Sequence, residues 1–235
     1  MYIVITSKCN MRCAHCGVSA TSKGEDMSME VFKAALGYAV DMGEQPYLGG
    51  GEPTMHPQFW EFIGLSMGRD FGTDIPVGLT TNGKITDIAL RLAEIAKIGA
   101  IVVTLSRDQY HEAISQKVID AFTKHPSERE FYPNDARDIR RRIADFQLSA
   151  IGRAKRLGYG VKGKCLCDGM VVKPNGDVMG CLCPNAYKAG NVLTGVDWGE
   201  YEDLLHEGYC SLQWAKKLAS NKENEQLLHE MHENA

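Results

Sequence analysis

Three cysteines near the start of the chain have the spacing of a loop that holds a metal cluster. Cys9, Cys13 and Cys16 form a C-x3-C-x2-C pattern directly after the apolar run Tyr2–Ile5. Three thiolates on one short loop can hold three corners of a cubane cluster, whereas a 4Fe–4S cluster usually takes four. The next cysteine along the chain is Cys165. One iron would therefore lack a nearby protein ligand and could bind a small molecule instead.

A zinc site or buried free thiols are the alternatives to a cluster at these cysteines. Zinc sites usually have paired C-x2-C or histidine spacings that complete four ligands. His15 could be a fourth ligand, but it lies between Cys13 and Cys16 with little reach. We expect its ring to pack over a cluster. The spacing therefore favours iron–sulfur chemistry.

Together with two later motifs, the cysteines resemble the signature of the radical S-adenosylmethionine (radical SAM) superfamily. The stretch Gly49–Pro53 follows a second apolar run and resembles the family's GGEP motif. Ser106 and Asp108 end a later run, Ile101–Leu105, where the family often places ribose-binding groups. The resemblance covers roughly residues 1–160. It implies an α/β fold, a partial (β/α)6 TIM-like barrel, with a 4Fe–4S cluster and S-adenosylmethionine as cofactors.

The resemblance also implies which residues bind these cofactors. The three cysteines would hold the cluster and would be both its metal ligands and the catalytic residues. Gly50, Gly51 and Glu52 would meet the methionine amino group, because glycines allow close backbone approach and a carboxylate accepts a charge-assisted hydrogen bond. The candidates for the ribose hydroxyls are Ser106 and Asp108, and those for the ribose and carboxylate ends are Asn82 and Arg153.

The reaction implied by the resemblance is reductive cleavage of S-adenosylmethionine. An electron from the reduced cluster would give a 5′-deoxyadenosyl radical, which abstracts hydrogen from a substrate. The protein would hold the geometry and exclude water and oxygen. We expect a flavodoxin or ferredoxin as the electron donor.

Three substrate classes remain, and we favour a ribosomal peptide or a protein-derived substrate. The first alternative is a small-molecule dehydrogenase or modifying enzyme for an alcohol, a sugar or a nucleoside. The second is an activase for a glycyl-radical enzyme. Because the first expected strand begins at Tyr2, peptide recognition would come from a separate partner protein. A metal-binding module without activity would explain the cysteines but not the GGEP motif.

Five further cysteines indicate a second metal site. A Pro-Asn-Gly-Asp turn lies between two C-x-C pairs and predicts a β-hairpin, and alternate residues of a strand face the same side. The pattern resembles a twitch or SPASM auxiliary-cluster extension over roughly residues 161–210, and a single twitch-type cluster fits the cysteine count. Zinc is the alternative, and either metal would stabilise a small extension. At most four of these five can be ligands: Cys165, Cys167, Cys181, Cys183 and Cys210.

Strands alternating with helices would place the motifs at one edge of a parallel sheet. Such sheets carry their sites at the carboxyl ends of the strands. The expected strands are Tyr2–Thr6, Pro46–Leu48, Ile75–Leu79 and Ile101–Leu105. The first expected helix begins at the capping residue Ser28. The later helices are expected over Pro57–Met67, Asp87–Ile98 and Tyr110–Thr123, and Asp108 would cap the last of them.

The pattern is weaker after Lys124. Residues 125–138 favour a loop, Ile139–Ile143 a short basic helix, and Phe146–Ile151 a strand. We expect a radical SAM core over residues 1–160, the auxiliary extension over 161–220, and a polar tail over 221–235.

Composition excludes several classes of protein. The chain has 235 residues, a net charge of −4 and eight cysteines. The charge argues against non-specific nucleic-acid binding. No apolar run approaches the roughly 20 residues of a membrane-spanning helix, and no signal peptide is visible. Eight cysteines without a secretory context favour metal over disulfides, so we expect a reducing cytoplasm.

Overall fold

The computed structural model describes residues 1–72, 76–123, 136–142, 151–159, 169–183 and 186–199. Its strands form one 9-stranded sheet in the order β5-β4-β3-β2-β1-β6-β7-β8-β9. The first six are β1 (Tyr2–Thr6), β2 (Tyr47–Gly50), β3 (Gly78–Thr81), β4 (Val102–Asp108), β5 (Arg137–Arg142) and β6 (Val171–Val172). The last three are β7 (Asp177–Met179), β8 (Lys188–Asn191) and β9 (Gly195–Val196).

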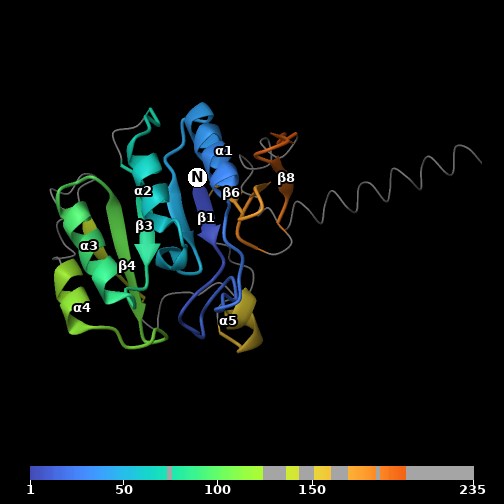
Figure 1. Cartoon of the computed structure of the whole chain (residues 1–235). Helices are drawn as coiled ribbons and strands as arrows, with labels where there is room; N and C mark the ends of the chain where they lie inside the picture. The colour runs from blue at the N-terminus through green and yellow to red at the C-terminus, as the bar shows by residue number, and fades with distance from the viewer. Residues whose placement is uncertain (73–75, 124–135, 143–150, 160–168, 184–185, 200–235) are drawn as a thin grey trace, which may run out of the picture.

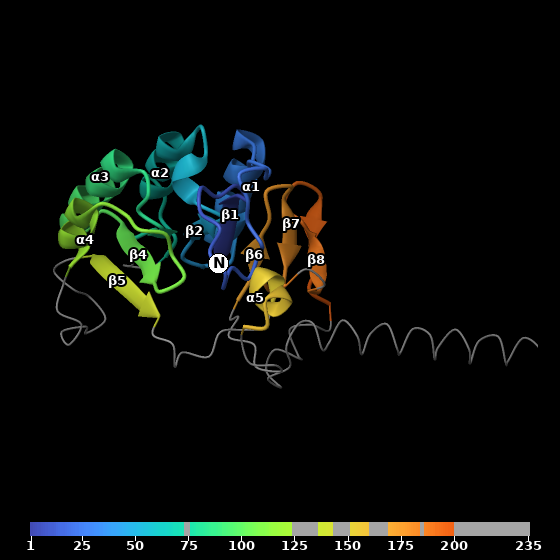
Figure 2. The same cartoon turned by 90° about the horizontal axis from the view of Figure 1, so that it is seen from below.

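Neighbouring strands from β5 across to β6 are parallel, and the pairs from β6 to β9 are antiparallel. Four helices lie on one side of the sheet (Figures 1 and 2). They are α1 (Met29–Asp41), α2 (Phe59–Met67), α3 (Thr86–Lys97) and α4 (Gln116–Phe122). This is the expected α/β arrangement, and the described strands form an open sheet, with β5 and β9 at its two ends.

The first helix shows how the sequence sets these elements. The Ser28 side chain accepts a hydrogen bond from the Val31 amide and caps α1, as expected. The buried face of α1 includes Phe32, which stacks on Phe62 of α2 with ring centroids 3.9 Å apart. Deleting such a buried ring typically costs about 3–5 kcal/mol. The apolar faces of the helices thus form the main core against the sheet.

Two expectations about the middle of the chain are wrong. The basic stretch expected as a helix is strand β5, which pairs with β4 over its whole length. Backbone hydrogen bonds to β4 make this stretch a strand although its sequence has little of the apolar character typical of strands. The helix expected from Tyr110 begins only at Gln116, because Asp108 instead accepts a hydrogen bond from the Tyr110 amide and forms a turn. Most of the expected strand Phe146–Ile151 lies outside the described residues.

The predicted hairpin is present and continues the main sheet. Strands β6 and β7 pair antiparallel around Pro174–Gly176, as the turn residues indicate. Strand β6 also pairs in parallel with β1. Two elements complete the fold, the 3-10 helix η1 (Pro53–Met55) and the short helix α5 (Gly152–Arg156). The expected C-terminal tail lies outside the described residues.

Candidate functional site

The motif residues lie together at the carboxyl ends of the parallel strands. The cysteine loop follows β1, the glycine motif ends β2, Asn82 follows β3, and Ser106 and Asp108 lie at the end of β4. Parallel pairing brings the ends of adjacent strands to the same edge of the sheet. The sheet therefore gathers residues from four separate segments of the chain.

The three cysteines are partly buried, and backbone amides point at two of them. The Met11 amide donates to Cys9 Sγ and the Ala20 amide donates to Cys16 Sγ, both at 3.4 Å. Burial raises the pKa of the Cys9 thiol and raises the pKa of Cys13 to about 12, with nearby negative groups adding to the effect. Amide donors to sulfur are a feature of iron–sulfur sites. A bound cation would supply the charge that thiolates need in this setting.

The three cysteine sulfurs, as they lie in the structure, are too far apart to bind one ion together. Three ligands of a single mononuclear ion must all lie within a few ångströms of one another. Among the described residues, the three cysteines do not form a group whose ligand atoms all lie within 4.8 Å of one another. In a cubane cluster each cysteine binds a different iron, so the sulfurs stand further apart.

The glycine motif packs directly against the backbone that enters the cysteine loop. The Gly51 amide donates to Thr6 O at 2.9 Å, and the Glu52 amide donates to Lys8 O at 2.7 Å. Gly50 has φ +125°, and a Cβ at that position would lie 2.1 Å from Thr6 O. A Cβ at Gly51 would lie 2.1 Å from Lys8 O. The glycines therefore let two chain segments touch, as close approach requires.

Tyr2 holds the same motif from β1. Its hydroxyl oxygen accepts a hydrogen bond from the Gly50 amide at 2.8 Å, and its ring stacks on Tyr47. The sequence indicated only that Tyr2 begins the first strand. Its hydrogen bond to the Gly50 amide fixes the glycine motif, and no local sequence pattern signals this contact.

Glu52 is buried and its carboxylate is held by neighbours. Oε1 accepts from the hydroxyls of Thr54 at 2.6 Å and Thr81 at 2.7 Å, and Oε2 accepts from the Asn82 amide at 2.7 Å. Burial raises the pKa of Glu52, while these hydrogen bonds oppose the shift. The carboxylate thus ties the end of β2 to the end of β3. The predicted role toward the methionine amino group remains a prediction.

Asn82 and Lys84, which follow β3, bind the cysteine loop. Asn82 Nδ2 donates to Asn10 Oδ1 at 2.8 Å, and Lys84 Nζ donates to Asn10 O at 2.9 Å. Lys84 also pairs with Glu112, which accepts from the Arg12 amide at 3.4 Å. The loop is therefore attached to segments that follow two other strands.

Arg153 of α5 binds the cysteine loop from the other side. Its guanidinium donates to Cys13 O at 2.8 Å and to Ala20 O at 2.5 Å. The Arg153 amide donates to Cys16 O at 2.9 Å. Its predicted part in binding a carboxylate remains a prediction, because in this structure its side chain orients the loop.

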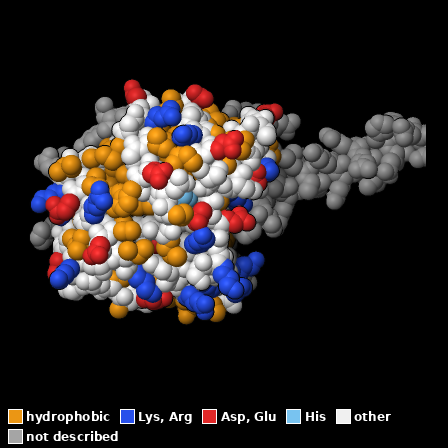
Figure 3. All heavy atoms as spheres, viewed as in Figure 1, with side chains coloured by type: hydrophobic (Ala, Val, Ile, Leu, Met, Phe, Trp, Pro, Cys, Tyr) orange, Lys and Arg blue, Asp and Glu red, His pale blue; other side chains and the backbone are white. Residues whose placement is uncertain are grey.

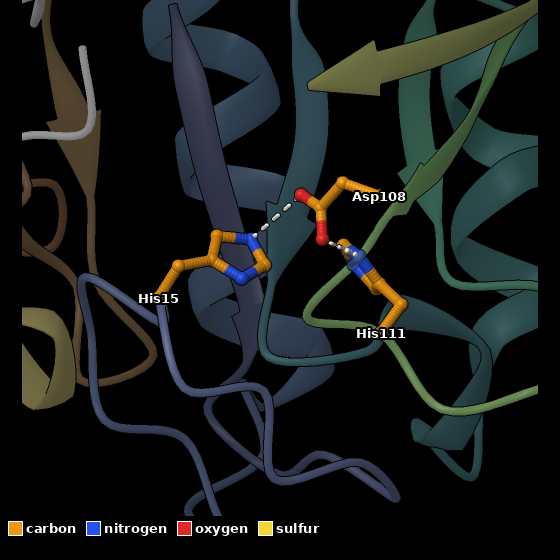
Figure 4. A group of neighbouring side chains, drawn as sticks. All are labelled: His15, Asp108 and His111. Carbon is orange, nitrogen blue, oxygen red and sulfur yellow. Dashed lines mark hydrogen bonds and ion pairs between the residues drawn. The ribbon is translucent and has the colours of Figure 1, made fainter. Parts of the chain in front are cut away.

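The end of β4 brings Asp108 next to two histidines. Asp108 lies 2.8 Å from His111 Nδ1 and 3.3 Å from His15 Nε2 (Figure 4). Ser106 is partly buried two residues earlier on the same strand. Sequence reasoning singled out His15, Ser106 and Asp108 separately. It did not foresee that Asp108 would lie between the two histidines.

The second cysteine group is described only in part. Cys181 and Cys183 are 1% and 3% exposed, and they pack in a small apolar cluster with Val4, Val171 and Met179. The other three cysteines of that group lie outside the described residues: Cys165, Cys167 and Cys210.

The surface and the helices add two general observations. On the face shown in Figure 3, acidic, basic and hydrophobic side chains are interspersed. Among the helices that the structure describes, none is long and apolar enough to cross a membrane.

Three curated proteins match parts of this chain. A cofactor-modifying protein for tungsten-containing aldehyde ferredoxin oxidoreductase from Pyrococcus furiosus is 36% identical over 113 residues, which are 46% of this chain and 30% of that protein. A GTP 3′,8-cyclase from Alkaliphilus oremlandii is 30% identical over 48% of this chain and 37% of its own length. The mycofactocin maturase MftC from Mycobacterium tuberculosis is 32% identical over 38% of this chain and 23% of its own. The matches thus span well under half of each relative.

Solved structures share the fold over most of the chain. BtrN in complex with AdoMet and 2-DOIA has a TM-score of 0.59 at 17% identity, covering 92% of this chain and 85% of that one. SuiB from Streptococcus suis bound to the precursor peptide SuiA has a TM-score of 0.50 at 12% identity, covering 83% and 62%.

A family model confirms the assignment that the motifs indicate. The model of the radical SAM superfamily matches residues 3–176, a span that contains the cysteine loop, the glycine motif and the end of β4. Membership implies a 4Fe–4S cluster and S-adenosylmethionine, and the donor set of the cysteine loop fits the cluster. The chain therefore belongs to the radical SAM superfamily of enzymes.

Proposed function

We propose that this enzyme cleaves S-adenosylmethionine reductively and abstracts hydrogen from a ribosomal peptide or a protein-derived substrate. The observation that carries the proposal is the cysteine loop, which is braced by the glycine motif, by Asn82 and by Arg153. When bound, a reduced cluster supplies the electron that breaks the sulfonium C–S bond and yields a 5′-deoxyadenosyl radical.

The residues of the chain have separate parts in this proposal. Cys9, Cys13 and Cys16 hold three irons. Gly50 and Gly51 keep the backbone next to the loop free of side chains, as the methionine end of the cofactor requires. The amides that point at Cys9 and Cys16 stabilise thiolate charge and so tune the reduction potential.

Ribose and carboxylate binding use the remaining polar residues at the strand ends. Ser106 and Asp108 are the candidates for the ribose hydroxyls, because β4 delivers them to the same edge of the sheet as the loop. Asn82 and Arg153 are next to the loop and are candidates for the ribose and carboxylate ends. Glu52 would accept a hydrogen bond from the methionine ammonium, using a carboxylate lone pair that its hydrogen bonds to Thr54, Thr81 and Asn82 do not use.

Two relatives support a peptide substrate. MftC is named a maturase, and the SuiB structure contains a precursor peptide. A separate recognition protein and a flavodoxin or ferredoxin donor complete this proposal. A second iron–sulfur cluster, or zinc, would use cysteines of the extension over residues 161–220, which follows a core over residues 1–160.

A small-molecule substrate is the second candidate. The GTP 3′,8-cyclase relative acts on a nucleotide by its name, and it matches 48% of this chain. An alcohol, sugar or nucleoside substrate would use the same cluster and the same cofactor. The two candidates differ in the molecule that would give up hydrogen to the 5′-deoxyadenosyl radical.

Anaerobic reconstitution tests the proposal. Iron and sulfide are measured in the wild type and in the Cys9→Ala/Cys13→Ala/Cys16→Ala variant, and electron paramagnetic resonance is recorded with and without S-adenosylmethionine. We expect the variant to lose about four irons, the signal that responds to S-adenosylmethionine, and 5′-deoxyadenosine formation with dithionite. A wild type that binds no iron at this loop would overturn the proposal.

Deuterium transfer into 5′-deoxyadenosine then separates the substrate classes. Candidate peptides and nucleosides, each deuterated, are incubated with the reconstituted enzyme and S-adenosylmethionine. Deuterium arriving only from the peptide supports the first candidate. Arrival only from the nucleoside replaces it with the second.

A further inference from the structure

A compact group of ligand-type side chains lies beside the cysteine loop. His15, Asp108 and His111 each offer one ligand atom, and these three atoms lie within 4.8 Å of one another. Figure 4 shows the Asp108 carboxylate between the two imidazole rings, with one oxygen toward each. The residues come from the cysteine loop, the end of β4 and the turn that follows β4.

All three side chains are largely shielded from solvent. The side chains of His15, Asp108 and His111 are 11%, 1% and 8% exposed. A carboxylate with so little access to water is costly unless a cation or several donors face it. The Tyr110 amide and the two imidazole rings face the Asp108 carboxylate, and a divalent ion held between the three side chains would add full positive charge.

The carboxylate is already oriented for such a role. Asp108 Oδ1 accepts from the Tyr110 amide at 2.8 Å, which sets the direction of the side chain. Oδ2 faces His15 Nε2 at 3.3 Å. Ligand atoms of a tetrahedral zinc ion are about 3.3 Å apart, given metal–ligand distances of about 2.0–2.1 Å. Ligating carboxylates are commonly hydrogen-bonded from behind in this way.

The rings are also held by packing. The His15 ring lies 5.2 Å from the Tyr110 ring and 5.0 Å from the His111 ring, centroid to centroid. The turn from Asp108 to His111 is closed by the His111 amide, which donates to Asp108 O at 3.2 Å. These contacts hold both imidazole rings beside the Asp108 carboxylate.

We propose that His15, Asp108 and His111 bind one divalent ion of the zinc class, separate from the cluster of the cysteine loop. Two imidazoles and one carboxylate are a ligand set of catalytic zinc sites, which keep a position open for water or for an oxygen or nitrogen atom of a substrate. The proposal goes beyond the proposed function and does not rest on it, since it needs neither cluster nor S-adenosylmethionine. It gives the Asp108 carboxylate to the metal, which leaves Ser106 as the β4 residue for the ribose hydroxyls.

The test is a zinc titration of the reconstituted holoenzyme. The protein is first treated with a chelator that leaves the iron content unchanged, and Zn²⁺ is then added under anaerobic conditions. Bound zinc is counted by mass spectrometry, and its neighbours are identified by X-ray absorption at the zinc edge. We expect one zinc that disappears in Asp108→Asn, with nitrogen and oxygen neighbours at about 2.0–2.2 Å.

Two variants and one control make the result specific. Asp108→Asn keeps the size of the side chain and an oxygen for the Tyr110 amide, and His111→Ala removes a different ligand. Each should weaken zinc binding by more than the roughly 10–100-fold that loss of an outer-shell partner costs, because each variant removes a ligand. Asp87→Asn is the matched control, because it makes the same change at an exposed carboxylate in the first turn of α3. Its zinc affinity should equal that of the wild type.

Iron content and the signal that responds to S-adenosylmethionine are recorded for every sample. They show whether the cluster is loaded, so failure of this proposal is distinct from failure of the proposed function. Zinc that binds equally in Asp108→Asn and His111→Ala, zinc with only sulfur neighbours at about 2.3 Å, or a wild type that binds no zinc would each overturn the proposal.

Discussion

The two cysteine regions that the structure describes are held in different ways. The N-terminal loop is only partly buried, and hydrogen bonds from the glycine motif, from the segment after β3 and from α5 hold its backbone. Cys181 and Cys183 are buried in a small apolar cluster just after β7. The first region is held by polar contacts from distant segments of the chain. The second combines packing around its sulfurs with short-range hydrogen bonds, such as that from the Ala186 amide to Cys183 O at 3.1 Å.

This difference suggests what each region needs in order to work. A loop that must receive a cluster and a cofactor has to stay accessible, so its shape is fixed from behind by bonds to carbonyls. Buried sulfurs gain stability from burial itself, since free cysteine behaves as a small apolar side chain. The second region therefore has a purpose in packing even without metal, and variants can separate the two.

The largest expected effect is on product formation and iron content when one cysteine of each region is replaced. Cys13→Ala should abolish 5′-deoxyadenosine formation, because one iron loses its thiolate. Cys181→Ala should keep the signal that responds to S-adenosylmethionine, while about four irons are lost if the second region holds a cluster. Iron analysis and product assays on the two variants measure this. Unchanged iron in Cys181→Ala would assign that cysteine to packing alone.

A pair of glycine substitutions should break the two regions differently. A Cβ at Gly50 would lie 2.1 Å from Thr6 O, and one at Gly190 would lie 2.3 Å from Gly195 O, both at positive φ. Each alanine should lower the free energy of unfolding by roughly 2–3 kcal/mol or more. Only Gly50→Ala should also reduce iron loading at the cysteine loop, since only Gly50 touches the strand that leads into it. Equal iron loss in both variants would contradict the comparison.

Arg153→Lys should loosen the cluster loop without unfolding the chain. Lysine cannot repeat the two-carbonyl contact of the guanidinium. Losing a charge-assisted bond costs about 1.5–3 kcal/mol, so cluster loss to a chelator should be roughly tenfold faster or more. The control is Arg156→Lys, an exposed residue of the same helix. Identical rates for both variants would show that the contact to Cys13 O is without consequence.

Cluster loading should depend on pH with a defined sign. The pKa values of Cys9 and Cys13 are raised, the latter to about 12, so both thiols are protonated at neutral pH in the cluster-free protein. Loading must release the proton of each thiol that binds an iron, and it is therefore favoured as pH rises from about 7 to about 9. A pH indicator during anaerobic cluster transfer measures the release. Loading that weakens over this range would contradict the burial argument.

The smallest expected effect comes from a substitution outside both cysteine regions, which serves as their common control. Gly37 lies inside α1, and a Cβ there meets nothing within 4 Å. Gly37→Ala should raise the free energy of unfolding by about 0.5–1 kcal/mol. Iron content and product formation should stay unchanged. Thermal unfolding with iron analysis measures both.

Sequence patterns predicted the motifs and the strands that carry them, because short-range signals determine both. Ser28 caps its helix and the Pro174–Gly176 turn makes its hairpin. Strand β5 escaped prediction since a pairing partner, not an apolar pattern, makes it a strand.

The contacts that fix the site were beyond prediction for another reason. Arg153 reaches Cys13 across 140 residues of sequence, and Asn82 reaches Asn10 across 72. Neither pair shares a local pattern, because only the folded sheet brings their segments together. The identities of site residues can thus be read from sequence, whereas their partners cannot.

The contact of Arg153 with the cysteine loop also has a consequence for biosynthesis. The cysteines are made well before the guanidinium that binds Cys13 O and Ala20 O, since 140 residues separate Arg153 from Cys13. A nascent chain therefore presents its three thiols on an incompletely supported loop. The loop gains the support of Arg153 only after α5 has been made, so a cluster inserted earlier would be held by a less supported loop.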